Sequence, residues 1–145
     1  MSSVTRALCD HMLADANITA LVGTRIYQDM APAGSALPRI TFSLGGEDYV
    51  EQLQGAAADL VHTTIQVDCW AATPDSTTTI AEALRQSLQG FIGAMGDLSL
   101  DVRHCTIRGR FSLFSEPDSA DDISIYRISQ DARIISTQPV PPLPA

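Results

Sequence analysis

The residues best suited to chemistry in this sequence are three cysteines and three histidines. A thiol beside an imidazole could act as a nucleophile, and several such groups at ligand spacing could hold a metal. The six residues are Cys9, His11, His62, Cys69, His104 and Cys105. The two close pairs diverge, because residues two apart on a helix or adjacent on a strand point to different sides. The sequence therefore predicts no catalytic, metal or cofactor site, and the odd number of cysteines indicates free thiols rather than a disulfide framework.

Cys69 falls on the apolar face of its expected strand, so we interpret it as a small core residue rather than a nucleophile. A small hydrolase or metal enzyme that uses Cys69, His62 or His104 stays open as an alternative. Such an enzyme would lose its activity, but not its assembly, when these residues are replaced.

The charge pattern argues against sequence-specific nucleic-acid binding. The chain has a net charge of −8, with nine arginines and no lysine, whereas nucleic-acid binding requires a basic surface. Arg103, Arg108 and Arg110 form the one arginine cluster, which we interpret as solvated strand edges or ion pairs between subunits. The acidic loop 115–122 lacks the register of a calcium-binding loop, so we expect it to be solvated.

Length and composition fit one globular domain. The chain has 145 residues, of which 45% are hydrophobic and 18% charged, values typical of a soluble protein. No apolar run approaches the roughly 20 residues that cross a bilayer, and the first ten residues lack the apolar core of a signal peptide. We therefore expect no membrane association.

A strand that leads directly into a helix forms the centre of the expected fold. Residues 61–71 alternate between apolar and polar side chains, and residues 74–89 repeat apolar side chains every three or four positions. Thr73 is a suitable N-cap, and Gly90 or Gly93 can end the helix in a left-handed conformation. Trp70 lies on the polar face of the strand, where it is either a core tryptophan shielded by neighbouring structure or an anchor at an interface.

The remaining segments complete an α+β fold. A helix is expected from Ser3 to about Asp15, and a short second helix is expected to begin at Asn17 as its cap. Strands are expected at 39–53, 98–113 and 123–135, and the first pairs with 61–71 as a long antiparallel hairpin. Leu98, Leu100 and Val102 are expected on one strand face, and a change of parity past His104 indicates a bulge.

These elements predict a single α+β domain over residues 1–137. Two main helices pack on one face of a four-stranded antiparallel sheet, in the order α-β-β-α-β-β. The proline-rich residues 138–145 are expected to form an extended tail outside the core.

Four ordered blocks resemble the phage tail completion family, also called tail terminator or head-to-tail joining proteins. The resemblance spans roughly residues 5–135, and the blocks that carry it are LVGTRIY at 21–27, AP and ALP at 31–38, IQVDCWA at 65–71 and YRIS at 126–129. The resemblance implies a structural, non-enzymatic virion protein that forms a ring, usually of six subunits. Such a ring caps the finished tail tube, stops its polymerisation and offers a docking surface to the head connector.

The partners implied by the resemblance are further copies of the chain, the tail tube protein and a head connector or head-closure protein. DNA would pass through the lumen of the ring without sequence-specific binding, and an acidic wall would repel its phosphates. The protein would lie in the tail or neck of the virion after assembly in the bacterial host cytoplasm. A head-closure or connector subunit of the same neck is the runner-up, and a cytoplasmic adaptor unrelated to virions is a further alternative.

The residues expected at interfaces are exposed apolar or charged side chains near strand ends and loops. They are Tyr49, Val50, Leu53, Trp70, Arg108, Arg110, Glu116, Asp118, Asp121 and Asp122. An amphipathic hairpin tip invites association, so we predict that residues 45–58 contact a neighbouring subunit or the tail tube. The segment after Thr137 is expected to be ordered only when it docks on such a partner.

Overall fold

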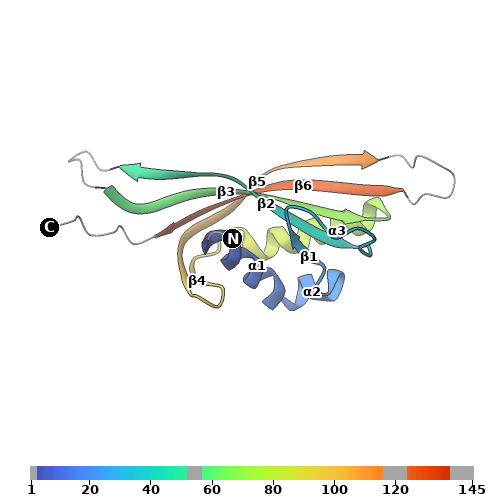
Figure 1. The fold of residues 1–145 in the computed structure, drawn as a ribbon, viewed down its shortest axis with the longest axis horizontal. Helices are drawn as coiled ribbons and strands as arrows, with labels where there is room; N and C mark the ends of the chain where they lie inside the picture. The colour runs from blue at the N-terminus through green and yellow to red at the C-terminus, as the bar shows by residue number, and fades with distance from the viewer. Residues whose placement is uncertain (1–2, 52–56, 116–123, 138–145) are drawn as a thin grey trace.

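The computed structural model describes residues 3–51, 57–115 and 124–137, which form one α+β domain (Figure 1). Its elements are α1 (Ser3–Ala14), α2 (Ala16–Val22), β1 (Ile26–Gln28), β2 (Arg39–Glu51), β3 (Ala57–Ala71), α3 (Pro74–Leu88), β4 (Gly93–Met95), β5 (Leu100–Ser115) and β6 (Ile125–Thr137). The six strands form one curled sheet in the order β1-β2-β3-β6-β5-β4, in which β1 is parallel to β2 and the other neighbours are antiparallel. The α+β class is confirmed. The predicted four-stranded antiparallel sheet with two main helices is wrong, because the described residues contain six strands of mixed direction and three helices.

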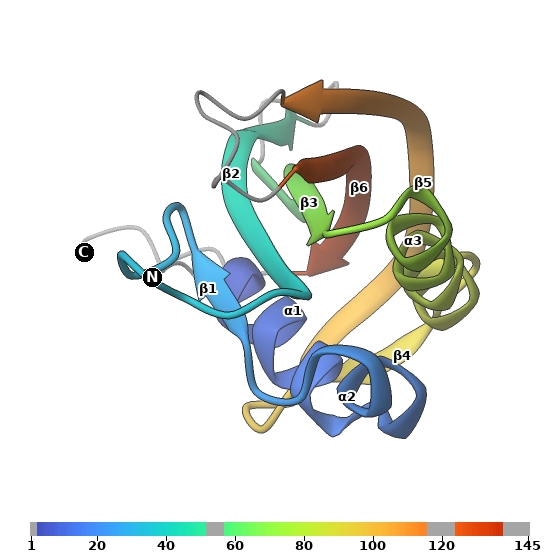
Figure 2. The same ribbon diagram turned by 90° about the vertical axis from the view of Figure 1, so that its right-hand side faces the viewer.

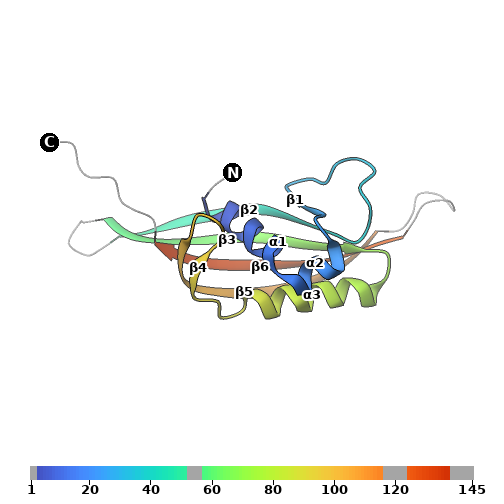
Figure 3. The ribbon, with the colours of Figure 1, turned by 90° about the horizontal axis from the view of Figure 1, so that it is seen from below.

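The sheet has one covered face and one open face. The apolar side chains of β3 that alternate from Val61 to Ala71 are buried beneath the helices, as the period of two requires. Figure 2 looks along the strands and shows the curl of the sheet. Figure 3 shows the helices lying across the sheet, while β2 and β3 continue well past them at one end. The core therefore lies between the helices and the middle of the sheet.

Helix α3 begins and ends close to the predicted positions. The Ser76 amide donates to Thr73 Oγ1 at 3.2 Å, and Pro74 occupies the first helical turn, where its missing N–H leaves no bond unmade. After the helix, Gly90 has a φ of +77°, so the predicted left-handed ending is confirmed there. The buried face of α3 includes Ile80, Leu84 and Leu88.

The start of α2 was predicted two residues too late. The carboxylate of Asp15, and not Asn17, caps the helix: Asp15 Oδ1 accepts from the Asn17 amide at 2.8 Å and the Ile18 amide at 3.4 Å. Asp and Asn have similar cap preferences, so the sequence offered two candidates and the tight turn after α1 selects the first.

Two short strands at the margins of the sheet were not predicted. Strand β1 pairs with Ile40–Phe42 of β2, and β4 pairs with Leu100–Val102 of β5. Each has three residues, which is too short for a period of two to be visible. Gly93 and Gly96 lie at the two ends of β4, and glycines of this kind are typical of turns, so the sequence contained no indication of a strand there.

The predicted bulge in β5 is confirmed. The pairing with β6 shifts between Val102 and His104, and it shifts again between Arg108 and Arg110, where Gly109 has a φ of +74°. The expectation that Leu98 shares a strand face with Val102 is wrong. Leu98 lies in the turn before β5 and is exposed.

Several predicted features lie outside the described residues. These are Leu53 at the hairpin tip, the acidic side chains Glu116, Asp118, Asp121 and Asp122, and the proline-rich segment 138–145.

Candidate interaction surfaces

The sheet leaves a long stretch of edge strand uncovered on each side. Strand β1 covers β2 only as far as Phe42, so Ser43–Glu51 has no outer neighbour among the described strands; we call this stretch the β2 edge. On the other side, the β5 backbone is covered at Cys105 and Ile107, because the Gly90 amide donates to Cys105 O at 2.8 Å and the Ile107 amide donates to Gln89 Oε1 at 3.0 Å. Beyond these bonds, Arg108–Ser115 is open in the described part of the chain; we call it the β5 edge.

The two edges lie at opposite ends of the molecule. Strand β2 runs toward one end of the sheet and β5 toward the other, as Figure 1 shows. One molecule therefore cannot join its own β2 edge to its own β5 edge.

Both edges carry exposed apolar side chains. Nine large hydrophobic side chains are exposed in the described residues, and five of them lie on the two edges: Leu44, Tyr49, Phe111, Leu113 and Phe114. Their exposed fractions range from 44% to 67%. Exposed apolar groups on an open strand edge favour association with another chain. The side chain of Val50, the third predicted contact in this region, lies outside the described part.

The edges carry opposite charge. The β2 edge contains Glu47, Asp48 and Glu51 and no basic residue, whereas the β5 edge contains Arg108 and Arg110 and no acidic residue. Among the side-chain hydrogen bonds and ion pairs of the described residues, none involves Asp48 or Arg108, so both charges are available to a partner.

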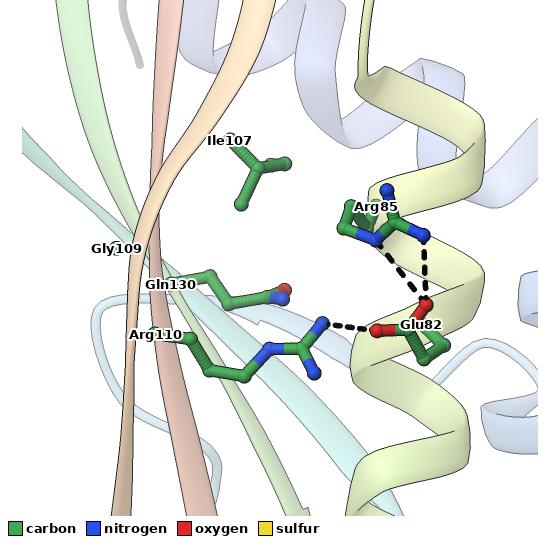
Figure 4. A pocket seen from close by; sticks show the side chains of 6 residues that line it. All are labelled: Glu82, Arg85, Ile107, Gly109, Arg110 and Gln130. Atoms are coloured by element: carbon green, nitrogen blue, oxygen red, sulfur yellow. Dashed lines mark hydrogen bonds and ion pairs between the residues drawn. The ribbon is translucent and has the colours of Figure 1, made fainter.

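Arg110 is committed to a contact within the subunit. Its Nη2 lies 2.6 Å from Glu82 Oε1, and Arg85 Nη2 lies 3.1 Å from Glu82 Oε2 (Figure 4). With its amide oxygen facing Arg110, Gln130 also accepts from Arg110 Nη2 at 3.0 Å. The hydrogen bonds from Arg110 and Arg85 lower the pKa of the Glu82 carboxyl. These groups line a pocket of about 450 Å³ between α3 and β5. Because Arg110 and Arg85 are both paired with Glu82, neither guanidinium is free to bind an anion, and the pair of Arg110 with Glu82 connects the strand to the helix.

Trp70 lies on the open face of the sheet, between two arginines. Arg39 on β2 and Arg127 on β6 are its cross-strand neighbours, and their guanidinium carbons lie 5.5 and 4.9 Å from the centre of the indole ring. The indole N–H donates to Thr41 Oγ1 at 2.9 Å. The half-buried ring therefore packs between neighbouring side chains outside the core, and its role as an interface anchor stays a prediction.

The bond between Trp70 and Thr41 is expected to stabilise this part of the sheet. Replacing Thr41 with valine keeps the volume but leaves the indole N–H without its acceptor, so we expect a loss of about 1–2 kcal/mol in the free energy of unfolding. Thr64→Val on the same face, at an exposed position, should change it by less than about 0.5 kcal/mol. Urea titrations of both variants measure the difference, and equal effects would show that the indole bond contributes nothing.

The cysteines and histidines do not converge. Cys69 and Cys105 are buried on the helix-covered face, and burial raises the pKa of Cys105 to about 12 and that of Cys69 further. His62 lies on the opposite face of β3 from Cys69, with its Nδ1 2.6 Å from Arg133 Nη2. In the described part of the chain, no three His, Cys, Asp or Glu side chains gather where they could hold a metal. The arrangement offers no thiol–imidazole pair between Cys69 and His62.

The buried thiols should resist alkylation in the folded protein. Because the thiolate is the reactive form, Cys69 and Cys105 are expected to remain unmodified by iodoacetamide at about pH 8, while half-buried Cys9 reacts slowly. Denaturant should expose all three, and peptide mass spectrometry measures each site. Rapid labelling of Cys69 in the folded state would instead support the nucleophile alternative.

The helices give no sign of a membrane span: none in the described part has the length and apolarity to cross a bilayer.

A small α+β domain with exposed apolar side chains on two open sheet edges is typical of a subunit in a larger assembly. The family model described as tail completion protein gp17 matches residues 6–134, and the chain belongs to this family. It is a structural protein of the bacteriophage tail.

A solved structure shares the fold. A chain in the structure described as "Virion of native gene transfer agent (GTA) particle" aligns with a TM-score of 0.60 over 95% of this chain and 100% of that chain. The two sequences are 24% identical, so the likeness shows a common fold. No curated protein matches this chain.

Proposed function

We propose that this protein is a tail terminator: a ring of identical subunits, six in number, that caps the tail tube and stops its polymerisation. The ring then joins the tube to the head connector or a head-closure protein. Membership in the tail completion family supports a role at the end of the tail. The proposed location is the tail or neck of the virion, after assembly in the bacterial host cytoplasm.

The observation that carries the ring is the pair of unlike open edges at opposite ends of the sheet. A contact between two different surfaces of the same protein is heterologous, and such contacts close into rings when the rotation between subunits permits. A contact between identical surfaces would stop at a dimer. The β2 edge also includes the first half of the hairpin segment 45–58, which we predicted to contact a neighbouring subunit or the tail tube.

The acidic character of the protein fits a conduit for DNA. The net charge of −8 disfavours strong contacts with phosphates, so a duplex could slide through the ring without sequence-specific binding. This part of the proposal concerns passage of DNA and requires no nucleotide-binding site.

Native mass spectrometry and negative-stain electron microscopy test the ring, with and without tail tube. The proposal predicts closed rings, with six copies in the mass spectrum and a ring on one end of each tube. A protein that stays monomeric and does not bind tubes would contradict it.

Tails from a mutant that makes no heads separate the proposal from the head-closure alternative. A terminator remains on headless tails and co-purifies with them. A head-closure subunit is absent from these tails and stays with heads.

A further inference from the structure

We propose that the β2 edge of one copy docks against the β5 edge of the next copy. The inference rests on the proposed function and names the surfaces that would join the ring. Its occupant is therefore a second copy of this chain, and charge complementarity between the two edges is the main argument.

The edges have matching form. Each is an open end of a long strand, and each extends about 25–30 Å at roughly 3.3 Å per residue. Each also begins at a shift of register, near Gly45 in β2 and Gly109 in β5. Bulges of this kind bend a strand and discourage indiscriminate pairing, so the contact depends on the side chains.

Charge selects the unlike pair. Two β2 edges would bring Glu47 and Asp48 against the same carboxylates, and two β5 edges would bring arginine against arginine. Like charges placed opposite each other disfavour a contact, whereas a β2 edge beside a β5 edge joins acid to base. The charges therefore favour a head-to-tail arrangement over a symmetric dimer.

Two free charges supply a specific pair. Asp48 and Arg108 have exposed side chains, and neither side chain takes part in a hydrogen bond or ion pair within the described residues. Around them lie the apolar side chains that association would remove from water: Leu44 and Tyr49 on one edge, and Phe111 on the other. Burial of these groups would contribute affinity, and the charges would set the orientation.

A charge swap tests the pairing. Asp48→Arg and Arg108→Glu are each expected to weaken self-association at least tenfold, because each places like charges across the contact. The chain with both substitutions should associate again, with the pair inverted. An equimolar mixture of the two single variants should also assemble, since an alternating ring contains only opposite-charge contacts.

Two controls separate this contact from a general effect of charge. Asp97→Arg and Arg6→Glu change the net charge by the same amounts at exposed sites away from both edges, and they should associate like the unmodified protein. Circular dichroism melting checks that every variant folds. For the unmodified protein, association should weaken between about 0.05 M and 0.5 M salt, which screens charges without any substitution.

Analytical ultracentrifugation and native mass spectrometry give the outcomes. Loss in both single variants with recovery in the mixture supports the edge contact. If the single variants form the same rings as the unmodified protein, or if the mixture fails to recover, the contact is wrong while the ring proposal stands. If the unmodified protein forms no ring even with tail tube, the proposed function and this contact both fail.

Discussion

Replacing Gly96 with alanine is expected to destabilise the protein by about 3 kcal/mol, one of its largest losses from a single methyl group. A Cβ at this position would lie 2.9 Å from Ala7 Cα and 3.2 Å from Ala7 O, which are backbone atoms of α1 that cannot rotate away. Gly96 also has a φ of +77°, where an L-residue costs roughly 1–2 kcal/mol, and overpacking adds about 1–3 kcal/mol. At this chain length, the melting temperature should fall by roughly 10 °C.

Gly90 supplies a matched control for Gly96. It has the same φ of +77°, but a Cβ there would meet nothing within 4 Å. Gly90→Ala should therefore cost only the backbone strain, about 1–2 kcal/mol. Scanning calorimetry of the two variants isolates the contact with α1, and equal losses would show that α1 does not approach Gly96 this closely.

Phe42→Ala is expected to destabilise the protein by about 3–5 kcal/mol. Phe42 is 1% exposed and lies in the core beneath the helices, so truncation removes apolar burial and leaves a cavity. Denaturant titration measures the loss as a lower midpoint with little change in slope.

Phe111→Ala removes the same atoms from the β5 edge, where the ring is 64% exposed. Its free energy of unfolding should change by less than about 0.5 kcal/mol, while self-association weakens. The pair separates the core from the interface. A large loss of stability in Phe111→Ala with intact assembly would place this residue in the fold instead.

Local patterns were sufficient to predict the centre of the fold. The change of period after Ala71, the cap at Thr73 and the glycine at 90 lie within one stretch of chain, so sequence alone located α3 and the hairpin before it. The shift of parity past His104 likewise predicted a bulge, because an extra residue moves every later side chain to the other face.

Features that depend on distant segments were not predicted. Strand β1 exists because the chain returns to lie parallel to Ile40–Phe42, and three residues carry no periodic signal of that return. Leu44 continues the apolar alternation of β2, yet it is exposed, next to the shift of register between Leu44 and Gly46. The sequence indicated an amphipathic hairpin, but it did not indicate at which residue the side chains of β2 change from buried to exposed.

The interaction surfaces were predicted only in part. Tyr49 and Arg108 were identified from local composition, and the structure places both on open edges. The sequence did not indicate that Arg110 would be held by Glu82, or that Phe111 and Phe114 would remain exposed, because both depend on where α3 lies against β5. The acidic loop lies outside the described residues, so its role at an interface stays a prediction.

The length of the tail tube is the most direct measure of the central claim. Electron microscopy would compare tubes from cells that lack this protein with tubes from cells that express it again. A terminator predicts overlong tubes of variable length in its absence, and a single length with a ring at the end when it is restored. Tubes of the same length in both cases, with no ring at either end, would contradict the account.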